Sequence, residues 1–332
     1  DEAESALRAI LKDLNSETLQ AGTGVRLVRL KATMQLTTFC SLMSRNEEKK
    51  EHAEDAYHQL LTLQDALENE REMAIEVASI AGTLATHLET VGVRTEAEKV
   101  IQLSQRTWKA LLAIEPQNRK FLLGMAQSLE RQGVQRMWHG DRREDAKSSF
   151  KEAFKRYEDI LSHDPLSREA RTGLSATHLS LGVICGWDRG FATAVEHGRS
   201  GIPILKNLLE DAPADQKLLS NLAIMQGNLI NHLNECGDNA GADQVKPEYF
   251  VTAKKMVELF PSVPSFLDRY HSASQQSIRL LFRNGEIAQA LTVARDLLAA
   301  VETAIKNEPS GNLDSLNQIA NWARLELACI LL

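Results

Sequence analysis

The sequence predicts an all-α protein, a right-handed α-solenoid in which antiparallel helix pairs stack on one another. Two series of helix-breaking residues indicate this fold. Prolines recur at nearly constant spacing, at positions 116, 165, 213, 261 and 309, and glycines recur at nearly the same spacing, at positions 92, 140, 190, 237 and 285. A fixed period of a few tens of residues is typical of repeat proteins, whose units bury their apolar faces only by stacking.

Composition also favours helices over strands. Leu and Ala dominate the apolar residues, whereas aromatic residues make up only 5% of the chain, and this balance suits long packed helices better than a sheet. A chain of 332 residues would fill two globular domains, but a solenoid needs no such division. We therefore expect one repeat domain over residues 1–332.

The elements follow from the two series. Residues 1–14 have helical apolar spacing and would form the second helix of a pair that lacks its first. In the first repeat, one helix should reach about residue 44, and a second should follow a charged linker at 45–50 and end near residue 69. Helix pairs are expected at about 20–67, 68–115, 116–164, 165–212, 213–260 and 261–308, with a half-repeat at 309–332.

The prolines and glycines should mark opposite ends of the first helix in each pair. Proline lacks an N–H that would have no partner in the first helical turn, so we expect each proline to lie there. Glycine adopts the left-handed conformation that ends a helix, so we expect each glycine to follow the last turn.

Two stretches depart from this pattern. Gly198, Gly201 and Pro203 fall inside the second helix of the fourth repeat and predict a kink or a split near residues 200–201. In the fifth repeat, residues 237–241 predict a longer loop, with Pro247 in the first turn of the helix that follows.

The distribution of charge argues against a general nucleic-acid binder, because the net charge is −7 and such proteins normally carry a basic stripe. One basic stretch lies within residues 117–156. We interpret it as a solvated helix face, and it is the only candidate surface for nucleic acid. Its cations, mostly at helical spacing, are Arg142, Arg143, Lys147, Lys151, Lys155 and Arg156.

The cysteines and the lengths of the apolar runs indicate the cellular compartment of the protein. The cysteines have no CxxC pairing and lie in apolar helical runs, which predicts buried thiols in a reducing compartment, the cytoplasm. No apolar run approaches the roughly 18 residues of a membrane span, and no signal peptide is visible. The four cysteines are Cys40, Cys185, Cys236 and Cys329.

The two ends of the sequence suggest a segment of a longer polypeptide. The sequence starts at Asp1 without a methionine and ends on an apolar run at 327–332. An uncapped end of a repeat array exposes apolar surface. We therefore expect end-to-end self-association through the C-terminal helix.

The residues from about 92 to 309 resemble the tetratricopeptide repeat (TPR) family. In the sixth repeat, residues 285–291 read GEIAQAL and precede Ala294, and this pattern is similar to that family's second-helix signature. The third repeat has the signature residues in the same order: Gly140, Ala146, Phe150, Ala153 and the closing Pro165. The family's usual unit is shorter, at about 34 residues, so both helices here should be longer. The resemblance implies that the first helices line a groove for a partner peptide or helix.

A second resemblance concerns the length of the repeats. Residues 174–182, LSATHLSLG, are similar to the C-terminal arrays of some large bacterial serine/threonine protein kinases. If this chain belongs to such a kinase, the catalytic residues of the kinase lie outside it, since the sequence contains no kinase motif.

A search for catalytic and ligand-binding motifs gives no candidate. The sequence has no HExxH motif, no Cys/His cluster with metal-ligand spacing, no nucleophile elbow and no phosphate loop, so we predict a non-enzyme without metal or cofactor. Residues 138–141 (WHGD) and 185–188 (CGWD) look most enzyme-like. Trp138 and Trp187 occupy the same place relative to the preceding proline of the series, and we interpret both as packing at a helix end.

The candidate partner-binding residues form a column at the repeat spacing on the first helices. Amides and guanidiniums offer several donors at fixed geometry and suit the recognition of extended backbone and carboxylates; an ordinary solvated stripe would look the same. We call this set the donor column: Arg131, Asn221, Asn228, Asn231, Arg269, Gln276, Arg279, Asn317 and Arg324.

Several functions are open at this point. We favour a non-catalytic scaffold for protein–protein interaction that binds a partner peptide or helix in the groove. The alternative is a regulatory or sensor module of a larger signalling protein that binds a small ligand and changes curvature. An enzyme would need a buried cluster of titratable residues, and a nucleic-acid role would need the basic helix.

Overall fold

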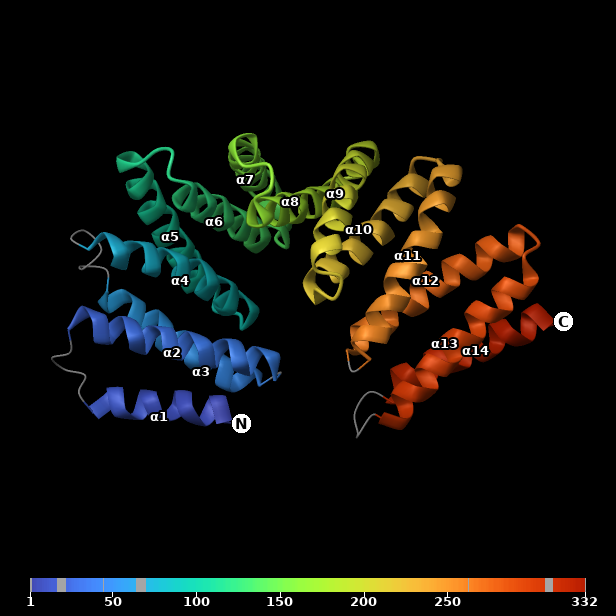
Figure 1. The fold of residues 1–332 in the computed structure, drawn as a ribbon, viewed down its shortest axis with the longest axis horizontal. Helices are drawn as coiled ribbons and strands as arrows, with labels where there is room; N and C mark the ends of the chain where they lie inside the picture. The colour runs from blue at the N-terminus through green and yellow to red at the C-terminus, as the bar shows by residue number, and fades with distance from the viewer. Residues whose placement is uncertain are drawn as a thin grey trace. The chain divides into compact units, whose positions relative to one another are not determined.

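The computed structural model describes residues 2–16, 22–43, 45–63, 70–261, 263–307 and 313–331, and these form α-helices, one short 3-10 helix and no strand (Figure 1). The predicted fold class, an all-α TPR-like array of antiparallel helix pairs, is confirmed. The helices are α1 (Glu2–Ser16), α2 (Thr23–Leu42), α3 (Asn46–Thr62), α4 (Arg71–Thr90), α5 (Arg94–Ile114), α6 (Arg119–Met137), η2 (Gly140–Arg142), α7 (Arg143–His163), α8 (Arg168–Trp187), α9 (Phe191–Asp211), α10 (Gln216–Glu235), α11 (Asn239–Leu259), α12 (Pro264–Arg283), α13 (Ile287–Asn307) and α14 (Leu313–Leu331).

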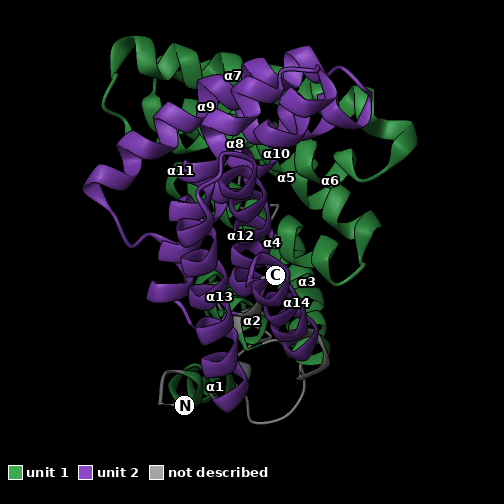
Figure 2. Cartoon of the chain, turned by 90° about the vertical axis from the view of Figure 1, so that its right-hand side faces the viewer, with its two compact units in different colours: residues 1–177 green, residues 178–332 purple. Residues whose placement is uncertain are grey.

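The chain divides into two compact units, residues 1–177 and 178–332, and the boundary falls inside α8 (Figure 2). In the first unit, apolar residues of α2 to α5 form one core, which includes Leu30, Leu60, Leu84 and Ile101. In the second unit, a core extends from α9 to α14. None of the helices in the described ranges is long and apolar enough to cross a membrane.

Within each unit, consecutive helices pack as neighbours along the chain, as in the pairs α4 and α5, α6 and α7, and α10 and α11. We call the even-numbered helices from α2 to α14 the first helices and the odd-numbered helices from α3 to α13 the second helices. The division into six repeats and a half-repeat within a single domain stays a prediction.

The prolines before the first helices lie in β-turns and not in the first helical turn, so that expectation is wrong. The N–H of Asn118 donates to the carbonyl of Glu115 at 3.1 Å, with Pro116 at the second position of the turn, and Pro165 and Pro213 lie in matching turns. This position suits the fixed φ of proline. The polar residue that closes each turn then caps the helix: the Asn118 side chain accepts from two backbone N–H groups, as does that of Asp215. Pro309 lies outside the described residues.

The glycine series is confirmed at three positions. Gly92, Gly237 and Gly285 have φ of 83°, 79° and 78° and end their first helices in the left-handed conformation. The other two positions differ. Gly140 begins the 3-10 turn η2, and in the α8–α9 turn the left-handed residue is Arg189, at φ 61°.

The predicted split in the fourth repeat is wrong, because α9 runs without interruption through Pro203. The two glycines serve close packing instead. A Cβ at Gly201 would lie 2.6 Å from Met225 Cε, and one at Gly198 would lie 3.2 Å from Leu229 Cδ1. Contact with α10 therefore explains both glycines.

The predicted loop at residues 237–241 is also wrong, because α11 already begins at Asn239 and Asp238 caps it by accepting from the Gly241 N–H at 2.8 Å. Pro247 consequently lies inside α11 and not in its first turn. The charged stretch 45–50 is largely the start of α3, not a linker. That helix ends at Thr62, with Leu63 as its C-cap, so the prediction that it ends near residue 69 is wrong.

The turn and cap before α6 yield a stability prediction. Asn118→Ala removes the acceptor for the Lys120 and Phe121 N–H groups and should lower the free energy of unfolding by about 0.5–2 kcal/mol. Thermal or urea unfolding measures this loss. The neighbouring exposed residue provides the control: Gln117→Ala should change stability little, and equal losses for both variants would contradict a capping role.

Candidate functional site

The donor column has nine members on four first helices. Asn221, Asn228 and Asn231 lie on α10; Arg269, Gln276 and Arg279 lie on α12; Asn317 and Arg324 lie on α14. These eight belong to the second unit, where α10 and α12 are in contact. Arg131 lies on α6 in the first unit. All nine side chains are exposed or half-buried.

Most of the donor column has no hydrogen-bond partner among the described residues. Arg324 is the exception, since it pairs with Glu302 at 3.0 Å and donates to Asn321. Buried polar groups are normally paired, yet the Gln276 Oε1 atom is buried and accepts no hydrogen bond. The column therefore offers amide and guanidinium groups that helix packing leaves available.

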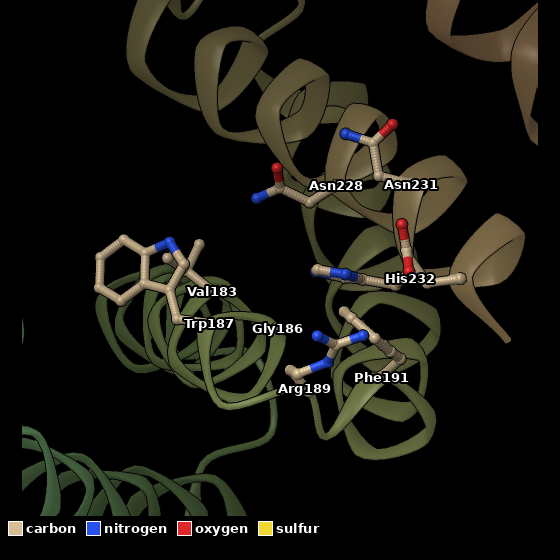
Figure 3. Close-up of a pocket in the computed structure, with 9 residues that line it drawn as sticks. Val183, Gly186, Trp187, Arg189, Phe191, Asn228, Asn231 and His232 are labelled. Carbon is tan, nitrogen blue, oxygen red and sulfur yellow. The ribbon is translucent and has the colours of Figure 1, made fainter.

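A pocket of about 450 Å³ lies at the end of α8, within the second unit (Figure 3). Asn228 and Asn231 line it, and so do aromatic and charged residues that the sequence analysis did not predict as a site. The lining comes from α8, from the turn after it, from the first residue of α9 and from α10. The lining residues are Val183, Gly186, Trp187, Arg189, Phe191, Asn228, Asn231, His232 and Glu235.

His232 is held at the base of this pocket by close packing. A Cβ at Gly186 would overlap the His232 ring, so only glycine permits this approach of α8 and α10. The ring of Phe191 lies 6.1 Å from the His232 ring. Burial lowers the pKa of His232, against the opposite effect of Glu235. The His232 Nε2 atom is buried and has no hydrogen-bond partner in the described part of the chain.

Arg189 enters the pocket from a strained turn. It is the residue other than glycine with a positive φ, 61°, among those described, and such a conformation costs about 1–3 kcal/mol. Figure 3 shows Arg189 among the side chains that line the pocket, together with Phe191 and His232. The pocket thus combines a cation, a carboxylate, an imidazole, two amides and two aromatic side chains. Its guanidinium and amide donors suit the carbonyl or carboxylate groups of an extended chain.

In the first unit, Arg131 lies against the backbone of α4, where a Cβ at Gly82 would overlap its guanidinium. Burial lowers the pKa of Arg131. His87 lies on the same helix as Gly82 and is within hydrogen-bonding distance of Thr38 Oγ1, at 3.3 Å. Burial, reinforced by the charges of Lys49 and Arg131, lowers the pKa of His87 to about 4.

Trp138 and Trp187 lie at helix ends as expected and are 69% and 38% exposed, so their shared packing role stays a prediction. The prediction about the cysteines needs correction. Cys40 is buried and Cys185 half-buried, whereas Cys236 and Cys329 are exposed. The prediction of four buried thiols is therefore wrong for these two.

One group could offer ligands to a metal ion. Cys40, Glu48 and His52 place a thiol, a carboxylate and an imidazole within 4.8 Å of one another, and the i, i+4 spacing of the last two on α3 was a signal in the sequence. Arg8 pairs with Glu48 at 2.6 Å and Arg45 lies 3.7 Å from it. Because these cations already neutralise the carboxylate, the group does not favour a divalent ion.

The basic stretch is largely neutralised within the first unit. Arg142 pairs with Glu98 at 2.7 Å, Lys147 with Glu144 at 2.6 Å, and Arg156 with Glu152 at 2.8 Å. Such pairing is expected of a solvated helix face.

Comparisons with known proteins show the fold. A scan against protein-family models gave no match, and no curated protein matches the sequence. Among solved structures, Nro1, a nuclear import adaptor of S. pombe, is 10% identical with a TM-score of 0.53, and 90% of this chain and 99% of that chain are covered. BtubC (BKLC) from P. vanneervenii is 13% identical with a TM-score of 0.52, over 77% of this chain and 91% of that one. Both likenesses concern the helical repeat fold alone.

The packing of Gly186 against His232 can be tested by a matched pair of substitutions in α8. Gly186→Ala should displace the His232 ring and lower the free energy of unfolding by about 1–3 kcal/mol. Gly182→Ala, whose Cβ would meet its nearest atom at 3.5 Å, should be neutral or stabilising by up to about 1 kcal/mol. Chemical unfolding measures both, and the His232 ring resonances report the displacement. An unchanged His232 environment in Gly186→Ala would contradict the packing described.

The lowered pKa of His87 predicts the direction of a pH effect. Between pH 6.5 and about 4 the unfolded chain binds a proton at this residue that the folded chain does not, so the free energy of unfolding should decrease as the pH falls through this window. His87→Gln should show a smaller decrease than the unsubstituted protein in unfolding curves at pH 7 and pH 4.5. His58→Gln, at an exposed ring, controls for the substitution itself; equal pH dependence in all three proteins would contradict the assignment.

Proposed function

We propose that the protein is a non-catalytic scaffold for protein–protein interaction, and that its first helices bind an extended partner polypeptide. The observation that supports this most is the donor column: eight of its nine side chains make no hydrogen bond to another described residue. An extended peptide presents backbone carbonyls and carboxylates that such amides and guanidiniums pair with at fixed geometry.

The pocket at the end of α8 would anchor one residue of that partner. Asn228 and Asn231 of the donor column line it beside Arg189, Trp187 and His232. Aromatic and arginine side chains supply much of the binding energy in protein interfaces. An acidic or aromatic residue of the partner would therefore contribute most of the affinity.

The structural neighbours are compatible with this role. Nro1 is named a nuclear import adaptor. Because the identity is only 10%, this likeness supports the fold of a binding protein and leaves the partner to experiment. A cytoplasmic location is part of the proposal.

A regulatory module that binds a small ligand is the alternative. The pocket of about 450 Å³ favours it, since small-molecule sites commonly have volumes of about 300–1,000 Å³. The comparisons give no support to a kinase parent, so the alternative concerns the repeats alone. Self-association through α14 also stays a prediction; Leu325 and Leu331 of this helix are exposed.

The scaffold role predicts a loss of binding on substitution of the donor column. Peptides should first be selected by display against the unsubstituted chain, which we expect to enrich acidic sequences. The double variant Asn228→Ala with Arg279→Ala should then weaken the selected peptides by about 10-fold or more, as calorimetry would measure, because hydrogen bonds to charged groups contribute about 1.5–3 kcal/mol each.

A double variant of the same residue types on second helices is the control. Asn239 on α11 and Arg295 on α13 are both exposed, and their replacement by Ala should leave peptide affinity unchanged. Equal affinities for both double variants and the unsubstituted chain would rule out the donor column as the binding surface.

A further inference from the structure

The pocket at the end of α8 (Figure 3) has two charged residues in its lining, Arg189 and Glu235. Both are exposed, and neither side chain forms an ion pair or a hydrogen bond with another residue in the described ranges. The imidazole of the lining, His232, is neutral at pH 7, because burial lowers the pKa of its ring. One pocket therefore presents a single cation and a single anion that do not pair with each other.

Arg189 occupies a position that the other turns of this kind give to glycine. Its N–H donates to the Gly186 carbonyl at 3.0 Å, and in the turn after α10 the Gly237 N–H donates to the Asn234 carbonyl at 2.9 Å in the same way. Both residues have a positive φ, 61° for Arg189 and 79° for Gly237. Glycine adopts this conformation without steric cost, whereas arginine does not. The turn would be more stable with glycine, so the guanidinium at this place points to a ligand.

Glu235 also lies where helix structure does not favour it. It is the last residue of α10, and the C-terminal end of a helix carries a partial negative charge that repels a carboxylate. Each charged residue of the lining thus lowers the stability of the element that carries it. A ligand that needs both charges would explain why both are present.

The apolar part of the lining favours an aromatic group. Trp187 is 38% exposed at the end of α8, and the ring of Phe191, at the start of α9, lies 6.1 Å from the ring of His232. Val183 also lines the pocket. Aromatic rings attract one another in offset and edge-on contacts beyond the effect of the area that they bury.

We propose that this pocket binds a free aromatic α-amino acid. The α-carboxylate of the ligand pairs with the Arg189 guanidinium, and its α-ammonium group pairs with the Glu235 carboxylate. The ring of the ligand packs against Trp187 and Phe191. This inference rests on the small-ligand alternative given above, which it deepens, and it does not require peptide binding.

A free amino acid fits these groups better than a residue within a peptide. In a peptide the α-amino and α-carboxyl groups form amides, so the two charges would have to come from separate side chains, whose ordering costs binding free energy. A free amino acid carries both charged groups on one carbon atom. The pocket volume of about 450 Å³ is within the range of small-molecule sites, about 300–1,000 Å³.

Three probes with the same phenyl ring test the two charge contacts in the full chain. L-Phenylalanine has both charges, 3-phenylpropanoate lacks the ammonium group and 2-phenylethylamine lacks the carboxylate. NMR titration gives the dissociation constants, with the Trp187 indole and His232 ring resonances as reporters of the site. We expect L-phenylalanine to bind about 10-fold more tightly than either analogue, because each analogue leaves one charged group of the pocket without its partner. Equal affinities for the three probes, or no binding of L-phenylalanine, would overturn the proposal.

Substitution of the two charged residues assigns the contacts. Arg189→Gly should weaken L-phenylalanine by about 10-fold without weakening 2-phenylethylamine, and the midpoint of thermal unfolding should stay the same or rise, because glycine fits the left-handed turn. Glu235→Gln should weaken L-phenylalanine without weakening 3-phenylpropanoate, and it keeps the test valid if Arg189→Gly folds poorly. Glu196→Gln, at an exposed position on α9 outside the lining, is the control and should change no affinity. L-Phenylalanine binding that persists unchanged in Arg189→Gly or in Glu235→Gln would overturn the proposal.

A variant outside the pocket separates this proposal from the scaffold role. Arg279→Ala on α12 leaves the lining intact, so it should weaken the selected peptides and leave the affinity for L-phenylalanine unchanged. A loss of L-phenylalanine affinity in this variant would place the probe elsewhere and overturn the proposal. Peptide binding without any binding of L-phenylalanine would overturn this proposal alone, whereas L-phenylalanine binding by a chain that selects no peptide would support it and remove the scaffold role.

Discussion

Close approach between neighbouring helices is the constraint on which the rest of the structure depends. A two-helix unit cannot bury its apolar faces alone, so each first helix must contact helices on both sides. Glycines on the first helices allow this at the largest side chains: a Cβ would overlap Trp108 at Gly124, Phe150 at Gly133 and Tyr157 at Gly173. The rings of Phe150 and Tyr157 are fully buried as a result. Interiors packed at this density leave little tolerance for an added methyl group.

The period of the sequence predicted the helices because turn chemistry repeats with it, but the role assigned to proline was wrong. The polar residues that actually start three of the helices were visible two positions after the proline, namely Asn118, Ser167 and Asp215. Conversely, Pro203 and Pro247 remain inside helices because packing on both sides outweighs the loss of one backbone hydrogen bond. The repeat period therefore predicted which helices exist, whereas local residue propensities predicted the ends of these helices less well.

The donor column could be predicted because its members share a helix face at the repeat spacing, whereas the pocket at the end of α8 could not. Its distinctive residue, Arg189, adopts a left-handed conformation that sequence patterns assign to glycine. One signal was present in the sequence. If the spacing between Gly237 and Gly285 is applied backwards from Gly237, it falls on Arg189, whereas the glycine of the series, Gly190, lies one residue later. The irregular interval in the glycine series thus coincides with the turn that brings a cation into the pocket.

Unpaired polar side chains of α10 differ in how far they are exposed to water. On the second helices, some exposed charges pair with a charge on the next second helix, as in Lys206 with Glu248 and Lys254 with Asp296. The Asn228 amide is half-buried and the Asn231 amide is exposed, so water hydrogen-bonds to them until a partner replaces that water with its own polar groups. Gln226 is almost fully buried, and its amide has no partner among the described residues, which lowers stability. Exposure to solvent therefore decides which unpaired amides a partner can use: the exposed ones can exchange water for the groups of a partner, whereas the amide of Gln226 is closed to both.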